Sequence, residues 1–143
     1  MGGISLQMIN NRISSDWWKS LVKHFVRAGD ALEIRCWREE TEEIRQASAY
    51  GTPEEDHYEV SVSGVVSEAL IAELLSEAPA DKRIYNKMTK YFTVNAEHAK
   101  RRFCSAHYGT EMYITGASDD DIAFFRRTME AYSGEDFSVS IEA

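Results

Sequence analysis

Histidine is the side chain best suited to acid–base chemistry near neutral pH, and the chain has four. Two of them, His98 and His107, flank a basic run from Lys100 to Arg102. Two imidazoles and a cation can cleave a phosphodiester without metal, because one imidazole removes a proton, the other donates one and the cation stabilises the charged intermediate. One hypothesis is therefore a metal-independent nuclease, or another phosphodiester-acting enzyme, that uses His98 and His107.

The same basic run also fits a solvated strand edge, where Lys and Arg discourage aggregation. The formal net charge of −8 opposes binding to nucleic acid, since phosphate contacts depend mainly on Lys and Arg. We therefore favour the structural interpretation and predict no catalytic residue. His24, beside the apolar stripe of a helix, is expected in a structural role, and His57 in a loop.

Metal and thiol chemistry are also poorly supported. Cys104 and His107 form a Cys-x-x-His fragment, but a closed zinc site needs four ligands and no second pair occurs. On one strand, positions 104 and 107 would point to opposite faces, which argues against a nucleophile and its base. The carboxylates from Asp119 to Asp121 are expected to stabilise a helix N-terminus. We predict neither a metal nor a cofactor.

The strongest charge feature is the segment from residue 39 to residue 59, where eight acids accompany a single base, Arg45. Such a surface attracts a basic partner and orients it, and nearby aromatic side chains can anchor the contact. The alternative is a solvated helix and loop without a partner. The predicted protein-binding residues are Trp37, Glu39, Glu40, Glu42, Glu43, Tyr50, Glu54, Glu55, Asp56 and Tyr58.

These observations favour a non-catalytic protein-binding domain with a basic protein as its partner. The most concrete version is an acidic immunity- or antitoxin-like inhibitor that neutralises a basic, nuclease-type bacterial toxin. A self-associating module is a third hypothesis, in which exposed aromatic side chains and strand edges form a homodimer. The charge argues against nucleic acid as the partner.

Cysteine usage and the terminal segment bear on location. Cys36 and Cys104 are too few for a disulfide framework, and each is expected as a reduced thiol on an apolar strand face. The first residues lack the basic flank and apolar run of a targeting peptide, and no stretch has the length of a membrane span. The sequence therefore favours a cytoplasmic protein without membrane contact.

Hydrophobic periodicity predicts the elements that position these residues. Apolar residues at alternate positions predict strands within 4–8, 32–36, 58–66, 104–114 and 137–141, and a further strand that ends near Val94. Helical spacing predicts helices that begin near Asp16, Ser67 and Ser118. A short helix is expected between Glu39 and Gly51, a helical turn around Ile84 and Met88, and a loop at 53–56.

The element order predicts an α+β fold. With 143 residues, 43% of them hydrophobic, the chain is expected to form a single domain over residues 1–143. We predict one mixed or mainly antiparallel sheet with about three main helices packed largely on one face. The initial strand–helix–strand order favours parallel pairing of the first two strands.

Overall fold

The structure is a computed structural model that describes residues 1–76 and 87–143. Strands form where apolar and polar residues alternate, and helices form where apolar residues recur every three or four positions. The strands are β1 (Gly2–Met8), β2 (Ala31–Trp37), β3 (Gly51–Asp56), β4 (Glu59–Val65), β5 (Thr93–His98), β6 (Arg101–Ala106), β7 (Glu111–Ala117) and β8 (Phe137–Glu142). The helices are α1 (Asp16–Phe25), α2 (Thr41–Ala47), α3 (Glu68–Ser76), α4 (Asp119–Met129) and the 3-10 helix η1 (Ser48–Tyr50).

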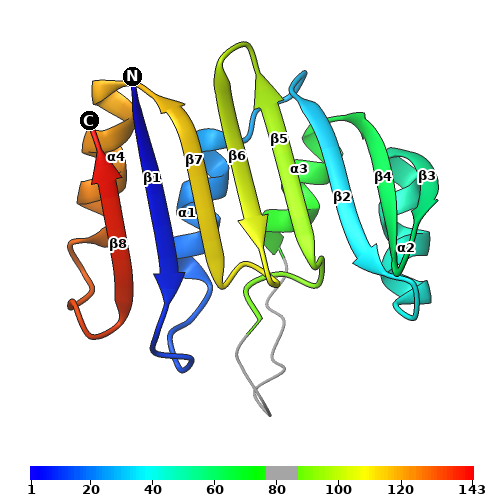
Figure 1. Ribbon diagram of the computed structural model, residues 1–143, viewed down its shortest axis with the longest axis horizontal. Helices are drawn as coiled ribbons and strands as arrows, with labels where there is room; N and C mark the ends of the chain where they lie inside the picture. Colours follow the sequence, from blue (N-terminus) through cyan, green and yellow to red (C-terminus); the bar gives the residue numbers. More distant parts are fainter. Residues whose placement is uncertain (77–86) are drawn as a thin grey trace.

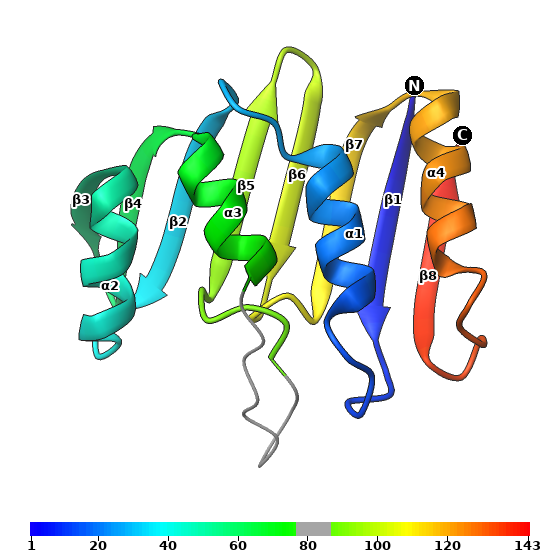
Figure 2. The same cartoon turned by 180° about the vertical axis from the view of Figure 1, so that it is seen from behind.

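The described strands form one sheet in the order β3-β4-β2-β5-β6-β7-β1-β8, and each neighbouring pair is antiparallel. The α-helices lie on one face of this sheet (Figure 1) and follow one another across it as α2, α3, α1 and α4 (Figure 2). The predicted α+β fold is confirmed. Two details differ from the sequence prediction. The described strands include no parallel pair, and the described α-helices number four where about three were expected.

The core lies between the sheet and its helices. Strand register aligns one row of apolar residues across five strands, and each side chain in this row is at most 4% exposed. Trp17 and Trp18 of α1 are enclosed above the sheet, and Trp18 Nε1 donates to Ser105 Oγ of β6 at 3.0 Å. The row comprises Ile4, Ile114, Phe103, Ala96 and Leu32.

Polar caps define the starts of two helices as predicted. Ser118 and Asp121 form a capping box at α4, in which each side chain accepts from the other residue's backbone N–H. At α3, Ser67 Oγ accepts from Leu70 N at 3.1 Å. Within residues 1–76 and 87–143, no helix is long and apolar enough to cross a membrane.

The predicted parallel pairing of the first two strands is wrong. In the sheet, β5, β6 and β7 lie between β2 and β1, although β1 and β2 run in the same direction (Figure 1). The cause is local: antiparallel neighbours can be joined by a short turn, and the short connections of β5, β6 and β7 produce a meander that occupies this space. The connection from β1 through α1 to β2 therefore passes over three strands, β7, β6 and β5.

Two boundaries also differ from the sequence prediction. Residues 53–56, expected as a loop, belong to edge strand β3, where Pro53 is tolerated because alternate residues of an edge strand direct their N–H away from the sheet. The strand expected to end near Val94 begins at Thr93 instead and runs to His98. The helical turn expected around Ile84 lies outside the described residues.

Candidate protein-binding surface

The sheet face opposite the helices, here called the open face, carries the polar half of each strand pattern. One row follows the strand register from β7 to β4 and contains Tyr113, Cys104, Asn95, Glu33 and Ser63. The next row runs from β5 to β3 and contains Thr93, Arg35, Ser61 and Glu54.

Arg35 of β2 organises the acidic end of the open face. Its guanidinium donates from Nε to Glu59 at 2.9 Å, from one terminal nitrogen to Glu33 at 3.0 Å and from the other to Asp56 at 2.7 Å. The pKa of Arg35 is raised, chiefly by the hydrogen bonds to Asp56 and Glu59. Three carboxylates around one guanidinium leave a net charge of −2, so this cluster remains negative although every member is paired.

Glu33 is the most fully bonded carboxylate of this cluster. It accepts from Ser61 Oγ at 2.6 Å, from Asn95 Nδ2 at 3.0 Å and from Arg35. Burial by itself would raise the pKa of Glu33, but the hydrogen bonds from Ser61, Asn95 and Arg35 outweigh burial and lower it. The donors come from three adjacent strands, so Glu33 stays ionised and links β4, β2 and β5.

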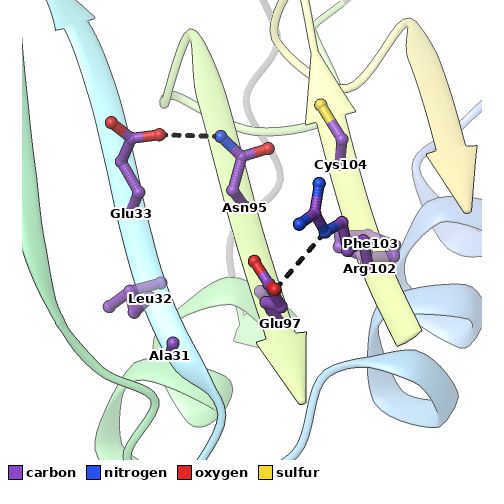
Figure 3. A pocket seen from close by; sticks show the side chains of 9 residues that line it. Ala31, Leu32, Glu33, Asn95, Glu97, Arg102, Phe103 and Cys104 are labelled. Carbon is purple, nitrogen blue, oxygen red and sulfur yellow. Dashed lines mark hydrogen bonds and ion pairs between the residues drawn. The ribbon is translucent and has the colours of Figure 1, made fainter. Parts of the chain in front are cut away.

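A shallow hollow occupies the open face beside this network. Its volume is about 370 Å³, and Figure 3 shows Glu33 and Asn95 joined across β2 and β5, with the ion pair between Arg102 and Glu97 further along. Within each of these two pairs, the polar groups of one side chain already contact those of the other. The charged side chains that line the hollow are therefore all paired, and Cys104 is the thiol in its lining.

An aromatic group borders the acidic cluster. The Trp37 ring lies 4.8 Å from that of Phe92, which also contacts Tyr108 at 5.3 Å and His107 at 5.5 Å, centroid to centroid. Trp37 is 37% exposed and lies opposite Glu59 in the strand register. A depression of about 430 Å³ is lined by Trp37, Phe92, His107, Tyr108, Thr110 and Glu111.

The residues predicted to bind a partner gather at one end of the molecule but on both sides of the sheet. Trp37, Glu54 and Asp56 belong to the open face by register, and Tyr58 is in the turn between β3 and β4, where it is 77% exposed. The others lie in or beside α2 and η1, or on the helix side of β3. These are Glu39, Glu40, Glu42, Glu43, Tyr50 and Glu55.

Several of these predicted residues are held by contacts within the chain. Tyr50 donates its hydroxyl to Glu73 at 3.1 Å and packs against the core. Glu42 pairs with Arg45, whose hydrogen bond lowers the pKa of Glu42 to about 2. Glu40 accepts from the Trp37 backbone N–H at 2.8 Å. Among the described residues, the acids of this segment without a hydrogen bond or ion pair are Glu39, Glu43 and Glu54.

Cys104 does not lie on the apolar strand face predicted for it. Phe103 and Ser105 take the buried positions of β6, whereas Cys104 is half-buried on the open face. The apolar alternation in the sequence does not keep to one face of the sheet from β6 to β7. The turn between the two strands places His107 and Tyr108 at positive φ and shifts the alternation. Cys36 is buried as predicted, and burial raises the pKa of its thiol to about 12 and also raises the pKa of Cys104.

The two histidines of the enzyme hypothesis lie far apart. His98 ends β5 and pairs in register with Arg101, the first residue of β6, whereas His107 follows the last residue of β6. A six-residue strand spans roughly 17–20 Å, too far for both imidazoles to reach one phosphodiester. His107 instead pairs with Glu111. No three His, Cys, Asp or Glu side chains in the described part of the chain form a group able to bind a metal.

Sequence reasoning missed the residues that organise this surface. Glu33, Arg35, Ser61 and Asn95 are not among the predicted binding residues, and Asn95 lies beyond the predicted end of its strand near Val94. The available signal was the alternation of Glu33, Arg35 and Trp37 within β2, which places opposite charges and an aromatic ring on one face. Their partners come from strands whose neighbours were unknown.

Comparisons of the chain with protein-family models, with curated proteins and with solved structures found no match. The features that bear on function are therefore the open face and the acidic end of the sheet.

Proposed function

We propose that this chain is a non-catalytic protein-binding domain that binds a basic protein at the acidic end of its sheet. The observation that carries the proposal is the exposed Trp37 beside the Arg35 cluster of net charge −2. An aromatic ring supplies contact area with few rotatable bonds, and the surrounding carboxylates select a cationic partner.

The anchor of the contact is the Trp37 edge of the aromatic depression. A Lys or Arg side chain from the partner fits over the Trp37 ring, where a cation and an aromatic face attract one another. Glu59 lies opposite Trp37 on β4, and Glu54 lies in the neighbouring row without a partner of its own in the described chain. The depression therefore offers an aromatic surface and negative charge together.

The finer proposal is an immunity- or antitoxin-like inhibitor of a basic, nuclease-type toxin. A nuclease holds phosphates with Lys and Arg, so an inhibitor that presents carboxylates can cover those cations. Arg35 holds Glu33, Asp56 and Glu59 in place before binding, which reduces the entropy lost on association. The net charge of −8 adds long-range attraction to such a partner.

The test begins with partners captured from an extract of the native host, each then purified and titrated against the chain by calorimetry. We expect a basic protein whose Kd increases with salt. Trp37→Ala should raise this Kd by about tenfold or more, as truncation of an anchoring aromatic residue usually does. The double variant Glu39→Gln/Glu54→Gln should weaken the salt dependence, because both carboxylates are unpaired.

The matched control removes the same charge at the opposite end of the sheet. Glu130 and Glu135 are exposed and follow α4. Screened charges at that distance have little effect on binding, so Glu130→Gln/Glu135→Gln should keep the Kd within about twofold of the wild-type value. A tightly bound partner whose Kd is unchanged by Trp37→Ala and by the Glu39/Glu54 double variant would show that this surface is not the binding site.

A further inference from the structure

The two edges of the sheet have opposite chemistry. Edge strand β3 carries Pro53 and three consecutive acids, which are common protections against pairing with another strand. Edge strand β8 reads Phe-Ser-Val-Ser-Ile-Glu and has one charge, at its last residue. In the described chain nothing pairs with its outer side. Figure 1 shows β8 as the last strand at that end.

The backbone groups free at this edge follow from one hydrogen bond. Ile9 N donates to Asp136 O at 2.8 Å, so the Asp136 backbone faces β1. In an antiparallel strand the polar groups of successive residues point alternately to the two sides. Ser138 and Ser140 therefore face β1 as well, whereas Phe137, Val139 and Ile141 present their N–H and C=O groups outward.

We propose that β8 pairs with β8 of a second copy of this chain, antiparallel and centred on Val139. This register places Val139 opposite its own counterpart and Phe137 opposite Ile141 of the second copy. Register with β1 puts these three side chains on the helix-covered face, because Val139 pairs with the buried Leu6 and Ile141 with the buried Ile4. Apolar side chains therefore meet apolar side chains.

The open face matches in the same register. Ser138 lies opposite Ser140 of the second copy, and hydroxyl pairs across strands are favourable. The sequence from Phe137 to Ile141 reads apolar, Ser, apolar, Ser, apolar in both directions, so the edge is self-complementary in a twofold interface. Val139, at the centre, is 43% exposed in the single chain. A second copy covers it and continues the antiparallel sheet.

One feature of the register opposes association. Glu142 lies opposite Asp136 of the second copy, and twofold symmetry repeats this pair of carboxylates at the other end of the contact. Like charges directly opposite each other are destabilising. The contact is therefore a reversible homodimer that forms as the concentration rises, with two acidic ends pointing away from the shared edge.

The experiment is sedimentation equilibrium of the intact chain, with charges placed on the symmetry axis. Wild type should approach twice the monomer mass at chain concentrations of about 500 µM, a range suited to weak interfaces. Val139→Lys and Val139→Glu should each be monomeric, because two like charges meet at the axis. An equimolar mixture of the two variants should regain the dimer mass, because Lys then lies opposite Glu.

The matched controls are Thr52→Lys and Thr52→Glu, which place the same charges on the exposed edge strand β3 and should leave the wild-type mass unchanged. Val139→Pro removes an outward N–H and no hydrogen bond to β1, so it should abolish the dimer while circular dichroism keeps the native signal. A wild-type chain that stays monomeric at about 500 µM would overturn the proposal. So would a dimer that survives Val139→Lys, or variants that remain monomeric when mixed.

Discussion

Arg35 and Glu33 illustrate how one pair of residues can organise an acidic surface. Arg35 alone would be a solvated cation on a sheet, but three carboxylates from β2, β3 and β4 converge on it. Glu33 shares this cation and adds two neutral donors. Paired groups of this kind hold their rotamers, so the surface that a partner meets is already ordered.

We expect Glu33→Gln to lower the free energy of unfolding by about 1–2 kcal/mol at pH 7, because a charged acceptor of three hydrogen bonds becomes a neutral amide. Denaturant titration at pH 7 and pH 3 measures the effect. The pKa of Glu33 is lowered from its ordinary value of 4.5, so its contribution is present above that value and is lost as pH falls through the lowered pKa. The deficit of Glu33→Gln should therefore shrink at pH 3.

The control for this prediction is Glu97→Gln on the same face of the sheet. Glu97 has one ion-pair partner, Arg102, and both side chains are largely exposed. Exposed pairs contribute little, so Glu97→Gln should change the free energy of unfolding by less than about 0.5 kcal/mol. Equal effects of the two substitutions, or a Glu33→Gln deficit that grows toward pH 3, would contradict the role given to Glu33.

At the scale of single residues, the sequence predicted the burial or capping role of a residue better than its contact partners. The burial of Cys36 and the cap at Ser118 follow from residue type and local spacing. The burial predicted for Cys104 is wrong because two left-handed turn residues separate the patterns of β6 and β7. A non-glycine residue at positive φ is uncommon, and Gly109 is the one residue of this turn whose type favours that conformation.

At the scale of elements, the helix α4 shows what local sequence can determine. Ser118, Asp121 and the apolar positions that follow predict a start and a buried face, and both are present. Asp121 also accepts from His24 of α1 at 2.9 Å, and its hydrogen bonds outweigh burial to lower its pKa. The same carboxylate therefore caps one helix and connects it to another.

Ser118→Ala should lower the free energy of unfolding by about 1 kcal/mol, the usual effect of removing a side-chain N-cap. The loss follows because Asp121 N then lacks its 3.1 Å acceptor. Thermal and denaturant unfolding measure it. Ser15 supplies the control, because it occupies the N-cap position of α1 without a side-chain hydrogen bond. Ser15→Ala should cost clearly less, and an equal cost would show that the Ser118 bond is not the source.

Element boundaries and pairing were less predictable than element type. The edge strand β3 was expected to be a loop because Pro53 and three acids suit one, and only its position at the sheet edge makes a strand acceptable. The parallel pairing expected for β1 and β2 failed because strand order depends on competition among all strands. Periodicity identifies strands and their buried faces, but not their neighbours.

At the scale of the whole molecule, the charge asymmetry seen in the sequence is retained only in part. The acids of residues 39–59 share one end of the sheet, yet they lie on both of its sides and several pair within the chain. The exposed acidic end is therefore smaller than the sequence count of eight acids implies. The prediction of a basic partner now depends on Trp37, the Arg35 cluster and the unpaired Glu39, Glu43 and Glu54.

The two proposed contacts should respond to salt in opposite directions. A basic partner is attracted by the acidic end, so salt should weaken its binding. Two copies of this chain each carry a net charge of −8 and repel one another, so salt should strengthen the β8 contact. Raising sodium chloride from about 10 mM to about 100 mM shortens the screening length from about 30 Å to about 10 Å.

We therefore expect the homodimer Kd to fall by about threefold or more over this salt range. Glu142→Gln should lower the Kd most at low salt and flatten its salt dependence, because it removes the carboxylate opposite Asp136 of the second copy. Glu54→Gln removes equal charge at the other end of the sheet, seven strand spacings or roughly 34 Å from β8, and should change the Kd much less. A dimer that weakens with added salt, or responds equally to both substitutions, would contradict the register centred on Val139.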